Sequence, residues 1–167
     1  MLRMLLLGTL LLAGTAFAEC QGPAAIKPPV GHEAFGAAHA QGEQIYQCTF
    51  SQGQYAWQYL APEAVLRNNQ GQVIGKHFAG PTWEAADGSK VTGKVLEKLD
   101  VSPDTSVPWL LLEAVGHEGK GLLAQTRFIT RIKTVGGLPP VSGCNSNHLG
   151  SEKRVAYTAD YVFFKAR

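Results

Sequence analysis

The stretch Val155-Ala156-Tyr157-Thr158-Ala159-Asp160-Tyr161-Val162-Phe163 decides the fold class of this chain. Its odd-numbered residues are all apolar or aromatic, and polar residues fall among the positions between them. Successive side chains of a β-strand point to opposite faces, so this period of two predicts a strand with one buried face. The apolar positions are rich in aromatic and β-branched residues, which fit a pleated, half-buried surface.

The same period of two recurs upstream. Residues 44–50 place Tyr46, Cys48 and Phe50 on one face, and Ser51-Gln52-Gly53 is a hairpin turn signal before a second alternating run. Further strands are predicted over 64–67, 73–79, 82–84, 90–100, 109–115 and 125–135. About eight or nine short strands separated by Gly and Pro turns, with no ten-residue helix, predict an all-β fold. An antiparallel β-sandwich and a barrel both remain open.

The N-terminus has the anatomy of a secretory signal peptide. Arg3 is followed by a leucine-rich stretch and by Ala16-Phe17-Ala18, a small-x-small cleavage site. We therefore expect a signal peptide over 1–18, cleavage after Ala18, and export to the periplasm or the extracellular space. Glu19 before Cys20 favours release over lipid anchoring. Residues 19–42, rich in Pro and Gly, are predicted to be an extended segment, and 43–167 a single β domain.

Charge and hydropathy exclude two classes of partner. Removal of Arg3 leaves 14 basic against 13 acidic residues, without a basic cluster. Nucleic-acid binding needs clustered cations that displace counterions from phosphates, so we predict no nucleic-acid partner. No segment reaches the roughly 20 apolar residues of a membrane-spanning helix, so we predict no membrane span. The oligomeric state is left open.

Three cysteines would remain after cleavage, at positions 20, 48 and 144. In an oxidising compartment a pair is normally bridged, and an odd number leaves one over. Cys48 lies in a predicted strand and Cys144 follows a Gly/Pro-rich turn, whereas Cys20 is close to the new N-terminus. We therefore predict a Cys48–Cys144 disulfide, the alternative being three free thiols.

Several motifs, in order, resemble one family. They are Gln44-Ile45-Tyr46-Gln47-Cys48, the run 75–84 with Asp87-Gly88-Ser89, Pro108-Trp109-Leu110-Leu111-Leu112, residues 134–144 and Tyr157-Thr158-Ala159-Asp160-Tyr161. Together they are similar to the domain of unknown function 3455 family of exported bacterial and fungal proteins. The resemblance covers about residues 42–164. It implies an exported single domain, fits the Cys48–Cys144 pairing, and supplies no catalytic residues.

Some fungal members carry a malate dehydrogenase label, and the residues argue against that chemistry. Gly119-Lys120-Gly121-Leu122-Leu123-Ala124 matches the loose G-x-G-x-x-A pattern, which works only as a strand-to-helix turn. The residues after this stretch have the pattern of a strand, so we predict that the glycine-containing stretch is a hairpin loop. No cofactor is predicted.

The densest group of catalytic residue types is His77, Glu84 and Asp87, beside Trp83. Two carboxylates that flank a glycan could act as acid and base, which would make the protein a secreted hydrolase. The preferred interpretation is structural: Trp83 packs on the core and Asp87-Gly88-Ser89 shapes a turn. The histidines lack the close spacing of metal sites, so no metal ligand is predicted.

Aromatic residues on strands supply the candidate ligand contacts, namely Trp57, Tyr59 and Trp83. Facing outward they would form a binding platform, and facing inward they would be core. The preferred function is a non-catalytic module that binds a small apolar or glycan ligand. The alternatives are the hydrolase and a structural or partner-binding protein.

Overall fold

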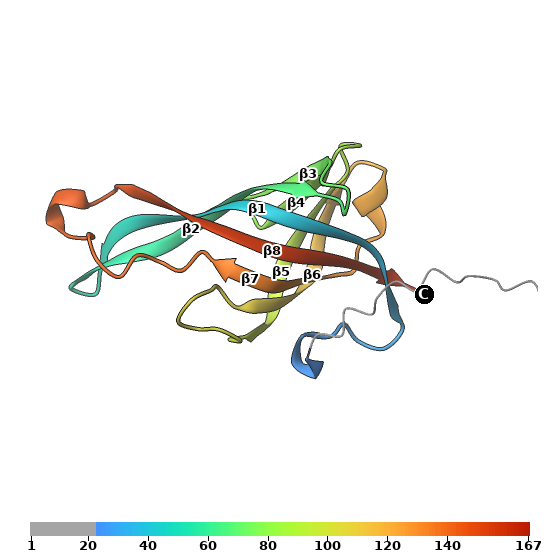
Figure 1. The fold of residues 1–167 in the computed structure, drawn as a ribbon, viewed down its shortest axis with the longest axis horizontal. Helices are drawn as coiled ribbons and strands as arrows, with labels where there is room; N and C mark the ends of the chain where they lie inside the picture. The colour runs from blue at the N-terminus through green and yellow to red at the C-terminus, as the bar shows by residue number, and fades with distance from the viewer. Residues whose placement is uncertain (1–22) are drawn as a thin grey trace, which may run out of the picture.

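The computed structural model describes residues 23–167, which form eight strands and three short 3-10 turns (Figure 1). The predicted signal peptide and Cys20 lie outside the described residues. In chain order the elements are η1 (Ala24–Ile26), β1 (His32–Ser51), β2 (Gln54–Arg67), β3 (Val73–Phe78), β4 (Thr82–Ala85), β5 (Lys90–Leu99), β6 (Trp109–Glu118), η2 (Leu122–Gln125), β7 (Phe128–Gly136), η3 (Ser146–His148) and β8 (Glu152–Ala166).

The strands form one closed antiparallel barrel in the order β1 to β8. Each strand pairs with the next along the chain, and β1 closes the barrel by pairing with β8 from His32↔Ala166 to Gln47↔Glu152. The all-β prediction is confirmed, and of its two open alternatives the described strands adopt the barrel. Closure pairs the first strand with the last, and residues 54–63 of β2, in the projecting hairpin, pair with β1 alone.

Strand β1 begins at His32, which corrects the predicted boundary at residue 43. The segment predicted to lie outside the sheet, 19–42, contributes residues 32–42 to β1. The inward positions here are Ala38, Ala40 and Gly42, so the stretch lacks the large apolar residues that mark a strand in sequence. Its pairing partner is the alternating strand β8, more than a hundred residues away in the chain.

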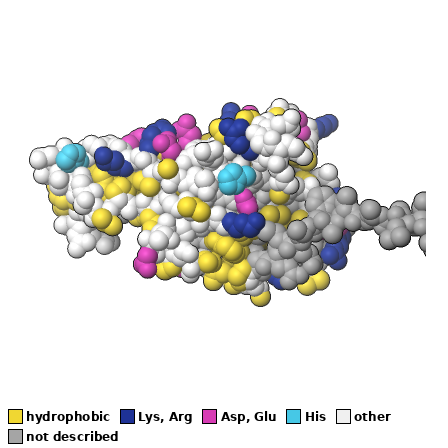
Figure 2. All heavy atoms as spheres, in the orientation of Figure 1, with side chains coloured by type: hydrophobic (Ala, Val, Ile, Leu, Met, Phe, Trp, Pro, Cys, Tyr) yellow, Lys and Arg dark blue, Asp and Glu magenta, His cyan; other side chains and the backbone are white. Residues whose placement is uncertain are grey.

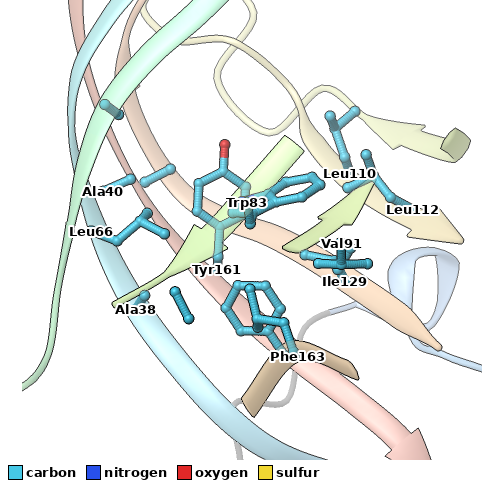
Figure 3. Packing of buried hydrophobic residues seen from close by; sticks show 14 of the residues in the cluster. Ala38, Ala40, Leu66, Trp83, Val91, Leu110, Leu112, Ile129, Tyr161 and Phe163 are labelled. Atoms are coloured by element: carbon cyan, nitrogen blue, oxygen red, sulfur yellow. The ribbon is translucent and has the colours of Figure 1, made fainter. Parts of the chain in front are cut away.

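The barrel interior packs small side chains of β1 and β2 against large ones from the other strands (Figure 3). Ala38 and Ala40 face the rings of Trp83, Tyr161 and Phe163, which meet edge to face at centroid distances of 5.2 Å and 6.4 Å from the Trp83 ring. Such perpendicular ring contacts add to the stabilisation from buried area.

A second apolar cluster covers the outer face of β6, β7 and β8. Ile26 of η1 is 1% exposed and packs with Leu111, Ile132 and Val162. The N-terminal segment therefore shields a sheet face that would otherwise be exposed, which explains why β6 and β7 are apolar on both faces.

The long hairpin β1–β2 projects beyond the barrel, and the connection 137–151 runs along it (Figure 1). The Cys48–Cys144 disulfide joins the two, which confirms the predicted bridge. The Trp57 indole Nε1 also donates to the Ser142 carbonyl at 2.8 Å. The covalent bond and this hydrogen bond fix the connection against the inner face of the hairpin.

The opposite end of the barrel is closed by the turn after β4 and the connection 119–127. The Asp87 carboxylate accepts from the Ser89 amide at 2.9 Å and from the Leu122 amide at 2.7 Å. Leu123 of η2 is 3% exposed and belongs to the interior cluster. Asp87 thus ties two connections together, and the G-x-G-x-x-A stretch lies in a loop between antiparallel strands, as predicted.

Candidate functional site

The open end of the barrel contains a cavity of about 440 Å³. Antiparallel order places the connections β1–β2, β3–β4, β5–β6 and β7–β8 at this end. The lining residues come from all eight strands and two of their connecting loops: Gln44, Tyr46, Tyr59, Leu60, Pro62, His77, Gly80, Pro81, Trp83, Val95, Lys98, Val107, Pro108, Leu110, Leu112, Arg131 and Tyr161. Exposed residues such as Tyr59 and Lys98 connect it to solvent.

The cavity walls are mainly apolar and carry positive but no negative charge. Among the described residues that line it, Arg131 and Lys98 are cations and none is acidic. Arg131, on β7, is 8% exposed, whereas Lys98 is exposed and lies near the end of β5. A charge removed from water is costly unless an opposite charge or several hydrogen bonds compensate it.

The Arg131 guanidinium is held by the loop before β6. Its Nε and Nη2 donate to the Pro108 carbonyl at 3.1 Å and 2.8 Å. A guanidinium has five N–H donors, so these two bonds leave three. No ion pair between Arg131 and a carboxylate occurs in residues 23–167.

Three further donors of the cavity wall have no acceptor within residues 23–167: Gln44 Nε2, Trp83 Nε1 and the Tyr161 hydroxyl. Each of these side chains is 1% exposed. Figure 3 shows the Tyr161 hydroxyl pointing away from Phe163 and Ala38. Burial raises the pKa of Tyr161, and the nearby Arg131 charge partly offsets this. The phenol is therefore a neutral donor at physiological pH.

His77 is buried in the wall as a neutral imidazole. Its Nδ1 donates to the Thr82 carbonyl at 2.9 Å, and its ring stacks on Trp83 at 4.4 Å. Burial lowers the pKa of His77 to about 3, the Thr82 bond opposes this shift, and the Arg131 charge adds to it. With Nδ1 protonated, Nε2 is an acceptor.

The three candidate catalytic residues do not meet in the cavity. His77 faces the interior, whereas Glu84 alternates to the outer face and contacts Lys76 at 3.4 Å. Asp87 lies at the closed end, where its carboxylate accepts hydrogen bonds from the backbone. Neither carboxylate lines the cavity. This arrangement lacks the facing pair of carboxyl groups that glycoside hydrolysis uses.

Two of the three candidate ligand residues do line the cavity. Tyr59 lies at the rim and is 52% exposed, and Trp83 forms part of the deep wall. Trp57 lies further along the hairpin, packs with Tyr46 and Cys48, and does not line the cavity. Tyr59 and Trp57 share one strand face, but the connection 137–151 covers Trp57.

Arg131 and Gln44 line the cavity and are site residues that the sequence did not identify. Each is a polar residue in an inward position with a buried apolar residue two positions away: Arg131 follows Ile129 on β7, and Gln44 precedes Tyr46 on β1. The alternation of inward and outward residues along each strand could have identified both as inward polar residues. Such a residue can also face a neighbouring polar group of the protein, so the alternation does not by itself indicate a ligand site. In the structure both residues face the cavity.

The outer surface differs from the cavity in its charge. On the face drawn in Figure 2, basic and acidic side chains are interspersed. Arg154, for example, contacts both Glu43 at 3.0 Å and Glu63 at 2.8 Å. Among residues 23–167 no group of His, Cys, Asp and Glu is arranged to hold a metal ion. In the same range no helix has the length and apolarity to cross a membrane.

Comparisons with known proteins agree with the motifs in the sequence. The chain has no significant match among curated proteins or among solved structures. A family model described as a protein of unknown function, DUF3455, matches residues 29–165, which includes all eight strands except Ala166, the last residue of β8. The chain therefore belongs to the DUF3455 family.

Proposed function

We propose that this protein is a non-catalytic binding module that holds one small, largely apolar molecule in the open end of its barrel. The cavity carries the proposal. Its volume of about 440 Å³ lies within the range of small-molecule sites, and eight-stranded barrels have room for one small ligand. Apolar walls with a few polar groups are typical of such sites.

The chemistry of the wall favours binding over catalysis. Among the described lining residues there is no Ser, Thr, Cys, Asp or Glu to act as a nucleophile or a carboxylate acid–base group. His77 is a neutral ring whose Nδ1 bonds to Thr82, and no carboxylate orients it. The Cys48–Cys144 disulfide supports a role in an oxidising compartment, so we place this binding function in the periplasm or outside the cell.

Binding of a neutral apolar fluorophore tests this proposal. N-phenyl-1-naphthylamine brightens when it leaves water, and we expect its fluorescence to rise saturably with one molecule bound per chain. Val95 lines the cavity and Leu96, its neighbour, is 43% exposed. Val95→Trp should fill the cavity and abolish the fluorescence rise, whereas the matched variant Leu96→Trp should bind as the wild type does.

Circular dichroism of both variants shows whether each remains folded. A folded Val95→Trp protein that binds the fluorophore as tightly as the wild type would contradict the proposal. Absence of saturable binding by the wild type would contradict it as well. Native mass spectrometry of protein from its own compartment would then identify any molecule that it carries.

A further inference from the structure

The cavity has one polar feature that its apolar walls do not explain: a buried cation without a counter-charge. Arg131 is 8% exposed, and no carboxylate of residues 23–167 forms an ion pair with it. Its charge reaches the surrounding groups, because it lowers the pKa values of Tyr46, Tyr157 and Tyr161 against the effect of burial.

The polar atoms around Arg131 are predominantly donors. The Tyr161 hydroxyl, Trp83 Nε1 and Gln44 Nε2 are buried without a hydrogen-bond partner in the described chain. The two bonds from Arg131 to Pro108 leave three of its five N–H groups for other acceptors. Buried hydrogen-bond donors are normally paired with an acceptor. A cavity wall with several unpaired donors therefore favours a ligand that is rich in acceptors. Water could accept from these donors, but only an anion would also compensate the Arg131 charge.

We infer that the ligand is a monocarboxylic acid with an apolar body, its carboxylate bound at Arg131 and Tyr161 and its body against Val95, Leu110 and Leu112. This inference deepens the proposed function and rests on it. A carboxylate has two acceptor oxygens and matches a guanidinium fork. A single charge suits a site with one buried cation, whereas a doubly charged phosphate would bury an extra charge.

The rim adds a second cation on the path of entry. Lys98 is exposed and lines the cavity, and it forms none of the ion pairs found in residues 23–167. A cationic mouth attracts an anionic ligand and raises its association rate, most strongly at low salt. Lys98 therefore guides the acid, and Arg131 holds it.

The experiment compares ligands with one apolar body and different head groups. Decanoate, decanol, decylamine and decyl phosphate each compete with N-phenyl-1-naphthylamine on the disulfide-bonded protein. We expect decanoate to bind tightest. Arg131→Gln should weaken decanoate by about thirtyfold or more and leave decanol within about twofold, because only the acid uses the charge. Arg154→Gln, an Arg on the outer face, is the matched control and should leave both unchanged.

The outcomes separate the two proposals. If decanol and the fluorophore bind but decanoate binds no better, or if Arg131→Gln leaves decanoate unaffected, the carboxylate inference fails while the binding function stands. A preference for decyl phosphate or decylamine also overturns it. If none of the probes binds, the proposed function itself fails. Unfolding curves for Arg131→Gln distinguish loss of binding from loss of the fold.

Discussion

Reduction of the Cys48–Cys144 disulfide should lower the free energy of unfolding by about 4.7 kcal/mol. The bridge spans 96 positions of the chain, and closing a loop of that size removes about 4.7 kcal/mol of denatured-state entropy at 25 °C in the chain-entropy model. A domain of this size has a total stability of about 5–15 kcal/mol, so the loss is a large fraction of it.

Urea unfolding of the oxidised and the reduced protein measures this difference. With an m-value near 2 kcal/mol/M, the midpoint should fall by about 2 M on addition of reductant. Tryptophan fluorescence reports the transition from Trp57 beside the bridge, which donates to Ser142, and from Trp83 in the barrel core. Circular dichroism reports the loss of the strands, and both signals should fall at one midpoint if the transition is two-state.

The double variant Cys48→Ala/Cys144→Ala is the control. It lacks the bridge but keeps Cys20, so reductant should leave its midpoint unchanged, and its stability should be close to that of the reduced wild type. A decrease below about 1 kcal/mol in the reduced wild type would refute the reasoning, since it would mean that the bridge barely restricts the unfolded chain. Stability of the double variant equal to that of the oxidised protein would refute it too.

Three other predictions concern the pH response, the packing of β1 and the closed end. Burial holds the pKa of His77 near 3 in the folded protein, against 6.5 in the unfolded chain. Below pH 6.5 only the unfolded chain binds the proton, so the free energy of unfolding falls by about 1.4 kcal/mol per pH unit as the pH drops toward 3. Above pH 6.5 the contribution of His77 to stability is complete. Urea midpoints from pH 7 to 5 should show this slope in the wild type and not in His77→Gln, and an equal slope in both would count against it. Gly42→Ala should lower the free energy of unfolding by about 3 kcal/mol or more, because the added Cβ would lie 2.1 Å from a backbone oxygen of β2. Gly116→Ala is the control: its added Cβ would lie 3.7 Å from the nearest atom, so the free energy of unfolding should change by about 0.5 kcal/mol or less in the same assay. Asp87→Ala should speed hydrogen exchange of the Leu122 amide, which donates to the carboxylate at 2.7 Å, and unchanged protection by NMR would show that the closed end does not depend on this contact.

The sequence by itself determined the fold class, the bridge and the family. Strand period depends only on which residues along the chain are apolar, and residues 155–163 carry that pattern in full. The pairing of Cys48 with Cys144 could be predicted because few cysteines were available and each of these two had a definite local structure. The start of β1 escaped prediction, because Ala38 and Ala40 are too small to mark a buried face.

Tertiary structure alone decided the site. Whether the strands close into a barrel depends on the pairing of β1 with β8, which local periodicity does not encode. Closure places Arg131 inside, among walls from all eight strands, and places Glu84 outside although it neighbours Trp83 in sequence. The alternation of apolar and polar residues along the sequence shows which side chains share a face of one strand. It cannot tell which strands face each other across the interior, and that arrangement creates the cavity and its uncompensated charge.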